Sequence, residues 1–265
     1  MGALLELDHI TKRFGQVTIA EDLSLVVEPG DAIGIVGPNG AGKTSLFGVI
    51  GGDLDPDQGE IRFDGAPITS LDPAIRCRLG IGRTYQVPRP FEDMTVFENI
   101  LLAAQQGAGT RGAASYELCA SVLDDTGLRA EANRPSGQLG LLQRKRLELA
   151  RALATRPRLL LLDEVAGGLT DPEVVDLVDV VRLAREGGTA VIWIEHVVRA
   201  LVDTVDRLIC LSGGRFVGDG VPSEVLASPA VREVFLGTEA TAESLAEAGL
   251  EAGHEPGRET GSSDR

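Results

Sequence analysis

The chain has 265 residues, of which 43% are hydrophobic, and a formal net charge of −15 at pH 7. This length suffices for one α/β domain with a substantial core and an inserted subdomain. The longest aliphatic block, from Leu159 to Leu162, is far shorter than the roughly 18 residues that cross a bilayer, and no secretory signal pattern is present. We therefore expect a cytoplasmic protein. The acidic balance and the lack of a basic stripe predict that nucleic acid is not a partner, and three cysteines without C-x-x-C spacing argue against disulfides or a zinc site.

Strand and helix patterns follow one another along most of the chain. Strands are expected at 4–10, 20–28, 32–36 and 59–63, with a helix at 43–50. A mainly helical region from about 87 to 153 is followed by aliphatic runs at 158–162 and 189–194, which are typical of buried parallel strands and enclose a helix at 172–186. Residues 238–265 are rich in Glu, Gly, Ala and Ser, which predicts an acidic, disordered tail. Residues 1–237 are thus expected to form one domain, with a helical subdomain at about 87–153.

A phosphate-binding loop is the most specific motif in the sequence. The stretch from Gly37 to Thr44 matches G-x-x-x-x-G-K-[ST] directly after a predicted strand and directly before a predicted helix. In such a loop the backbone N–H groups surround the phosphates of ATP, Lys43 reaches the β and γ phosphates, and the hydroxyl of Thr44 binds Mg²⁺. The predicted nucleotide-binding residues of this loop are Gly37, Pro38, Asn39, Gly40, Ala41, Gly42, Lys43, Thr44 and Ser45.

Two carboxylates follow the run of four leucines. Asp163 stands at the end of this expected buried strand, where a carboxylate can hold Mg²⁺ and its water shell. Glu164 comes next and can orient or deprotonate the water that attacks the γ-phosphate. Alone, such a string is more often a strand end that meets solvent, but beside a phosphate loop it predicts catalysis.

Two further segments indicate a family. Residues from Arg144 to Leu153 lead through Pro157 into the leucine strand, and residues from Ile192 to His196 end the next strand with a histidine. Together with the phosphate loop, this order of motifs resembles the ATPase subunit of ABC transporters over roughly residues 4–237. The resemblance implies an α/β fold with a P-loop NTPase (RecA-like) core, an N-terminal antiparallel β subdomain and an inserted α-helical subdomain. It also implies ATP hydrolysis with Mg²⁺, dimerisation with a second ATPase subunit, and docking on membrane-spanning permease subunits at the inner face of the cell membrane.

Three more site residues follow from this resemblance. Phe14 stands where the family stacks an aromatic ring on adenine, although a lone Phe before Gly is more often a core residue. Gln86 matches the glutamine that contacts Mg²⁺ and senses the membrane partner, and His196 matches the histidine that contacts the γ-phosphate. The segment from Gln86 to Phe91 is therefore expected to lie where the membrane helices dock.

Finer features resemble the ATPases of branched-chain amino acid uptake. The resemblance covers the segments from Gly82 to Gln86, from Phe91 to Ile100 and from Val221 to Gly237. It implies an importer, served indirectly by a solute-binding protein, for branched-chain amino acids or a related small organic solute. An exporter or a lipid or lipopolysaccharide extractor is the alternative within the fold. A soluble regulatory or DNA- or ribosome-associated ABC ATPase is the alternative of another class.

The sequence departs from the family at the motif called the signature, LSGGQ or LSYGQ. At that place the chain has Leu139-Gly140-Leu141-Leu142-Gln143, here called the signature segment. Gly140 lacks the family's serine hydroxyl, and Leu142 adds bulk where a glycine lets the backbone approach the γ-phosphate of the other subunit. A shifted alignment onto Ser136-Gly137-Gln138 would break the spacing to Arg146. We therefore hypothesise a heterodimer in which a different ATPase chain supplies an intact signature, with a homodimer as the alternative.

Overall fold

The computed structural model describes residues 2–196 and 198–236, and the predicted tail at 238–265 lies outside them. The central sheet has the strand order β10-β9-β3-β8-β7-β6. Every neighbouring pair from β9 to β6 is parallel, and β10 pairs with β9 in the antiparallel direction. Its strands are β3 (Ala32–Val36), β6 (Ile81–Arg83), β7 (Leu159–Asp163), β8 (Ala190–Ile194), β9 (Arg207–Ser212) and β10 (Arg215–Gly220).

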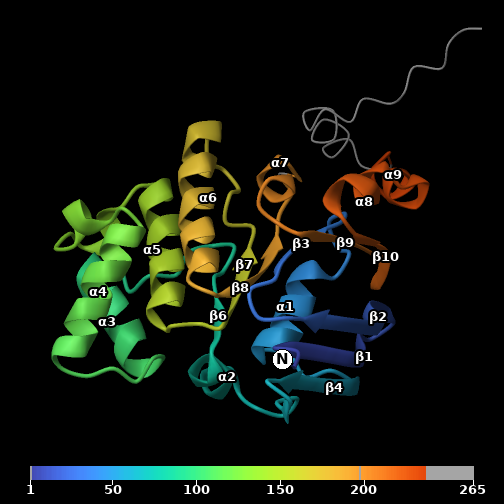
Figure 1. Ribbon diagram of the computed structural model, residues 1–265, viewed down its shortest axis with the longest axis horizontal. Coiled ribbons are helices and arrows are strands. Elements are labelled where there is room, and N and C mark those ends of the chain that lie inside the picture. Colours follow the sequence, from blue (N-terminus) through green and yellow to red (C-terminus); the bar gives the residue numbers. More distant parts are fainter. Residues whose placement is uncertain (1, 197, 237–265) are drawn as a thin grey trace, which may run out of the picture.

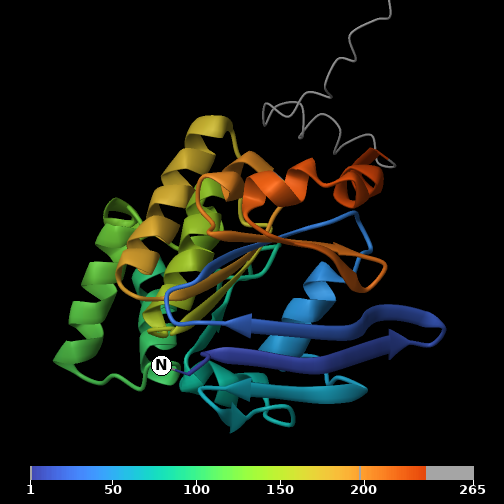
Figure 2. The same cartoon turned by 45° about the vertical axis from the view of Figure 1, so that its right-hand side comes forward.

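A second, antiparallel sheet forms the N-terminal part of the molecule. Its strand order is β2-β1-β4-β5, with β1 at Leu5–Phe14, β2 at Val17–Val27, β4 at Gln58–Phe63 and β5 at Ala66–Pro67. Helix α1 (Lys43–Gly51) lies between this sheet and the central one (Figure 2). The aliphatic side chains of both sheets and of α1 form one buried core, which fixes α1 and the loop before it.

The opposite face of the central sheet packs against helices. Trp193 of β8 is fully buried in this second core, among residues of α6 and the C-terminal helices. These helices are α6 (Asp171–Glu186), α7 (Val198–Val202), α8 (Pro222–Ala227) and α9 (Pro229–Leu236). Helix α6 begins with a capping box, in which Thr170 and Glu173 bond each other's backbone N–H groups.

Three helices to one side of the sheet have a hydrophobic core of their own (Figure 1). They are α3 (Val96–Gln106), α4 (Ala113–Asp125) and α5 (Leu141–Ala154), and two short 3₁₀ turns, Arg129–Glu131 and Ser136–Gln138, connect α4 to α5. A short helix, α2 (Pro73–Leu79), precedes β6. None of the helices in the described ranges is long and apolar enough to cross a membrane.

The expected α/β fold with antiparallel and parallel sheets is confirmed. Most expected strands and helices lie within a few residues of the observed ones, and the first strand extends to Phe14 rather than ending at residue 10. Helix α2, strand β6 and the elements from α7 onward had no specific prediction. Strand β6 has only three residues, too few for a periodic pattern to mark it.

Candidate active site

The phosphate loop joins β3 to α1, and its backbone conformation requires glycine. Gly37 has φ 151° and Gly42 has φ 104°, and both lie against backbone carbonyls. A Cβ atom would lie 2.0 Å from the oxygen of Leu211 at the first position and 2.2 Å from the oxygen of Ile19 at the second. A side chain at either position would therefore displace the main chain of β9 or β2.

Lys43, the first residue of α1, keeps its ammonium group inside the loop. Its Nζ donates to the carbonyl oxygens of Gly37, at 2.7 Å, and Pro38, at 3.0 Å. The side chain is buried, and burial lowers the pKa of Lys43, although the nearby Glu164 and Asp163 carboxylates oppose this effect. A cation is thus fixed where the loop would surround phosphate oxygens.

A cavity of about 380 Å³ opens beside this loop, at the carboxyl edge of the central sheet. Polar groups converge on it from the loop and from the ends of neighbouring parallel strands, as is typical of ligand sites in such sheets. The lining residues are Ile19, Asn39, Gly40, Ala41, Gly42, Lys43, Thr44, Ser45, Gln86, Glu164 and His196.

Asp163 ends β7 and is almost fully buried. Its Oδ1 accepts a long hydrogen bond of 3.5 Å from the Thr44 hydroxyl, and its Oδ2 lies 3.5 Å from a guanidinium nitrogen of Arg83. Burial raises the pKa of Asp163, and Arg83 acts in the opposite direction. The hydroxyl and the carboxylate are hard oxygen donors of the kind that Mg²⁺ binds, so this pair fits the ion.

The carboxylate of Glu164 contacts two other residues that the sequence predicted from separate motifs. Its Oε2 accepts a hydrogen bond of 2.5 Å from Nε2 of Gln86, and its Oε1 lies 2.7 Å from Nε2 of His196. Gln86 follows β6, Glu164 follows β7 and His196 follows β8. The parallel order β8-β7-β6 therefore gathers the three side chains over one end of the sheet.

Phe14 lies apart from this group. It ends β1 with half of its surface exposed, and Nζ of Lys12 lies 5.5 Å from the centre of its ring. Within the described residues it does not line the cavity, whose apolar lining includes Ile19 of β2 and Ala41 of the loop. Sequence reasoning assigned no role to Ile19 or Arg83. Ile19 lies in no motif, and the segment from Gly82 to Gln86 does not by itself show that Arg83 contacts Asp163.

The signature segment forms the start of α5. Gly140 is the N-cap residue and offers no side-chain cap, and Leu141 is half-exposed in the first turn. Ser136, from the alternative alignment, is fully buried: its hydroxyl donates to the oxygen of Phe91 at 2.8 Å and accepts from the Asn99 amide at 3.3 Å. A buried, bonded serine cannot reach another subunit's phosphate, which supports the alignment on Gly140.

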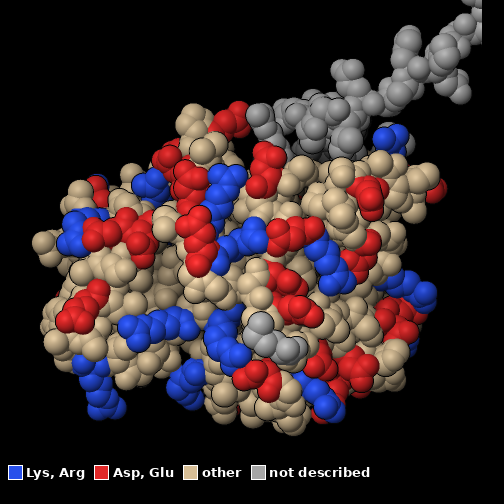
Figure 3. Space-filling model, viewed as in Figure 1, with Lys and Arg blue, Asp and Glu red and all other residues tan. Residues whose placement is uncertain are grey.

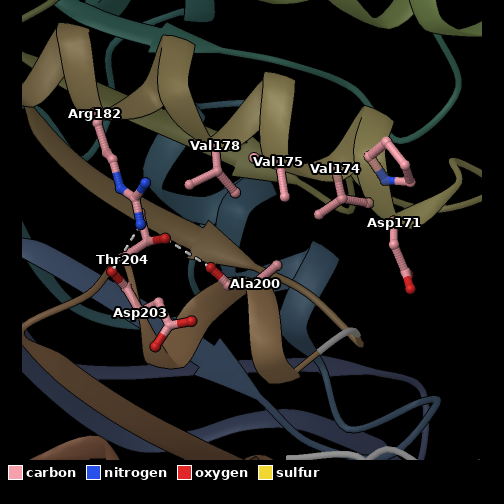
Figure 4. Close-up of a pocket in the computed structure, with 9 residues that line it drawn as sticks. Asp171, Val174, Val175, Val178, Arg182, Ala200, Asp203 and Thr204 are labelled. Carbon is pink, nitrogen blue, oxygen red and sulfur yellow. Dashed lines mark hydrogen bonds between the residues drawn. The ribbon is translucent and has the colours of Figure 1, made fainter.

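A cavity of about 410 Å³ lies between α6 and α7 (Figure 4). Val174, Val175 and Val178 of α6 face Ala200 and Thr204 in and after α7. Among the described residues that line this cavity there is neither a glycine-rich loop nor a lysine, and its cation, Arg182, already bonds Asp179 and the carbonyl oxygen of Asp203. The cavity therefore does not fit the phosphates of a nucleotide.

Comparison with known proteins places this geometry in a family. The model of the ABC transporter family matches residues 20–167. The chain is 34% identical to the high-affinity branched-chain amino acid transport ATP-binding protein BraF of Pseudomonas aeruginosa, over 88% of this chain and 98% of BraF. It is 32% identical to LivG of Escherichia coli K12, which has the same description, over the same shares. It is also 32% identical to the lipopolysaccharide export ATP-binding protein LptB of Acidithiobacillus ferridurans, over 90% of this chain and 99% of LptB.

Solved structures agree with these sequence relatives. A nucleotide-free ATP-binding cassette from an ABC transporter has a TM-score of 0.80 and 30% identity, over 89% of this chain and all of the other. An ATP-binding cassette in its ADP conformation has the same TM-score and identity, over 90% of this chain and all of the other. The resemblance inferred from the motifs is confirmed. The chain belongs to the ABC transporter family, as a nucleotide-binding subunit that hydrolyses ATP to drive transport.

Proposed function

We propose that this chain powers an importer of branched-chain amino acids or of a related small organic solute. The support is its likeness to BraF and LivG over nearly the whole of those proteins, together with the convergence of Gln86 and His196 on Glu164. LptB, with similar identity and coverage, makes extraction of lipopolysaccharide or lipid the second candidate.

Hydrolysis at this site is assigned to Glu164 as the group that orients and deprotonates the attacking water. His196 holds one carboxylate oxygen and then contacts the γ-phosphate, while Gln86 holds the other oxygen. Lys43 and the loop N–H groups stabilise the negative charge of the phosphates. Thr44, Asp163 and Gln86 would hold Mg²⁺, which neutralises charge on the β and γ oxygens when it is bound. Phe14 is assigned to the adenine ring.

The membrane partner is assigned to the surface around the segment from Gln86 to Phe91. Tyr85, Val87 and Phe91 are exposed apolar residues, and the Arg89 guanidinium lies 5.7 Å from the Tyr85 ring centre. Exposed aromatic and aliphatic groups beside a cation are typical of the centre of a protein interface. Acidic and basic side chains are interspersed over the face in Figure 3. Contacts between this surface and a permease subunit can therefore hold the chain at the inner face of the membrane, although its net charge is negative.

The second ATPase subunit is assigned to a different chain. Glu164, His196 and the phosphate loop are present here, whereas the signature segment offers no serine hydroxyl. Losing one such donor costs about 2.7–4 kcal/mol, or roughly 10²- to 10³-fold in rate. A heterodimer would therefore have one active site, built on this chain's loop, and one weak site.

Transport by the complete complex in membrane vesicles tests the proposal. With ATP outside inverted vesicles, where the ATPase subunits face the medium, or supplied to the ATPase face of proteoliposomes, we expect movement of labelled leucine or a related small solute, abolished by Lys43→Ala. Release of lipopolysaccharide or lipid instead would support the second candidate. Replacing both Val87 and Phe91 with serine should leave ATP binding intact and uncouple hydrolysis from transport, and unchanged transport would contradict the docking assignment.

A further inference from the structure

Glu164 has a left-handed backbone, which is uncommon for a residue with a side chain. Its φ is 49°, in the region that favours glycine. Such a conformation persists only where the surroundings hold it. Its N–H donates to the oxygen of Ile194 on β8 at 2.9 Å, and its own carbonyl accepts from Nζ of Lys145 at 3.2 Å. The backbone of this residue is therefore held on both sides.

A buried carboxylate holds the next turn of the same loop. Oε1 of Glu195 accepts the N–H of Ala166 at 2.7 Å and the indole N–H of Trp193 at 3.1 Å. Glu195 is 2% exposed and stands between the end of β8 and His196. Burial raises the pKa of Glu195 to about 7, while these hydrogen bonds and the nearby Lys145 cation oppose the rise.

Lys145 comes from a different part of the molecule. It is 5% exposed in the second turn of α5, the helix that begins with the signature segment. Burial lowers the pKa of Lys145, and the carboxylates of Glu195 and Glu164 act against this change. A buried ammonium group and a buried carboxyl group thus flank residues 164–166, one from α5 and one from the end of β8.

We propose that Lys145 and Glu195 are positioning residues that hold the Glu164 loop in the conformation required for hydrolysis, and that Lys145 links this loop to α5. The proposal rests on the assignment of Glu164 as the group that activates water. Neither side chain lines the nucleotide cavity, so their effect passes through the backbone of residues 164–166. A small displacement of a catalytic carboxylate lowers the rate without weakening substrate binding.

The link to α5 has a consequence for the dimer. In the family the signature approaches the ATP of the other subunit, so a shift of α5 is expected on dimer closure. Since Lys145 is on α5 and bonds the carbonyl of Glu164, such a shift also bears on the loop of the same chain. The pair would thus let this subunit adjust its own hydrolytic group to the state of the opposite site.

Turnover of the complete transporter, as kcat and KM for ATP, tests this inference with four variants. Glu195→Ala frees the Ala166 N–H, and we expect kcat to fall about 10- to 100-fold with KM within two-fold of the parent. Glu195→Gln retains an oxygen acceptor and should stay within about three-fold in kcat. Trp193→Phe removes the other donor to Glu195 while the bond to Ala166 stays, and should change kcat less than about two-fold, which makes it the control. The smaller buried ring also leaves a cavity, which lowers stability rather than kcat. Lys145→Met should lower kcat about three- to ten-fold at unchanged KM.

Hydrogen exchange of the peptide spanning 164–170 gives a readout that needs no turnover. It should speed up in Glu195→Ala but not in Glu195→Gln or Trp193→Phe. A folded Glu195→Ala variant with normal kcat, or one that raises KM alone, would overturn the proposal, as would an equal loss of kcat in Trp193→Phe. If Glu195→Ala does not fold, Lys145→Met decides, and full activity there refutes the pair. Normal turnover in Glu164→Gln would instead refute the assignment of Glu164 as the group that activates water, independently of the exchange result.

Discussion

Restoring the signature should raise the ATPase activity of the isolated chain. The change is Gly140→Ser together with Leu142→Gly, which returns the family's hydroxyl and close-approach glycine. Gly140 has φ −70° and ψ 174°, a conformation suited to an N-cap serine. A Cβ there meets only Oε1 of Gln143 at 2.9 Å, the far end of a side chain that can rotate. The serine therefore fits without moving the backbone.

The magnitude follows from the number of donors gained. One preorganised donor at a phosphoryl group contributes roughly 10²- to 10³-fold in rate, so we expect kcat to rise at least about 10²-fold. Glycine in place of Leu142 costs about 0.8–1 kcal/mol of helix stability, and a serine N-cap returns a few tenths. The double variant should thus melt only slightly below the parent.

The assay is ATP hydrolysis by the isolated chain over a range of protein concentrations, because the gain requires two subunits. Adding Glu164→Gln to the double variant should abolish the gained activity. Unchanged turnover in a folded, ATP-binding double variant would refute the reasoning, since the signature segment would then not limit catalysis.

Three other predictions concern buried or catalytic groups. Glu164→Gln should lower kcat about 10²- to 10⁴-fold while ATP affinity, measured by fluorescent-nucleotide titration, stays within a few-fold. Arg76→Met should lower the free energy of unfolding in urea by about 3 kcal/mol or more, because the fully buried guanidinium donates to four backbone carbonyls, and a loss below 1 kcal/mol would contradict this. Because the pKa of Glu195 in the folded state, about 7, lies above its unfolded value, its contribution to stability is complete below about pH 4.5 and is lost as pH rises to 7. In Glu195→Gln this pH-dependent part of the unfolding free energy, about 3 kcal/mol at most, should be absent from measurements across that range. If the pH dependence is unchanged, other groups cause it.

The sequence predicted the parts of the site that local motifs carry. The phosphate loop and the Asp163-Glu164 pair are two short motifs whose chemistry follows from residue type and spacing. Gln86 and His196 were found only through resemblance, and the structure then placed both against Glu164. Their roles remain proposals, as does that of Phe14.

The parts that sequence reasoning missed depend on contacts between distant residues. Lys145 precedes Glu164 by 19 positions, and Glu195 follows Ala166 by 29, so no local pattern shows that they hold one loop. Arg83 reaches Asp163 across 80 positions for the same reason. The left-handed φ of Glu164 was also hidden, since nothing in a Leu-Leu-Asp-Glu string requires it.

The phosphate loop with Glu164 and the signature segment lie on different elements of the chain. This separation explains how the signature segment could change while the phosphate loop and Glu164 did not. Lys43 begins α1 after the loop that follows β3, and Glu164 follows β7, so both are held by a core that includes both sheets and α1. The signature segment begins α5, whose buried face packs largely in the separate core of α3 and α4. Substitutions at Gly140 and Leu142 therefore leave the fold of the phosphate loop intact. Lys145 is the side chain through which α5 still acts on Glu164, so a chain that has lost its own signature retains a reason to keep this helix in place.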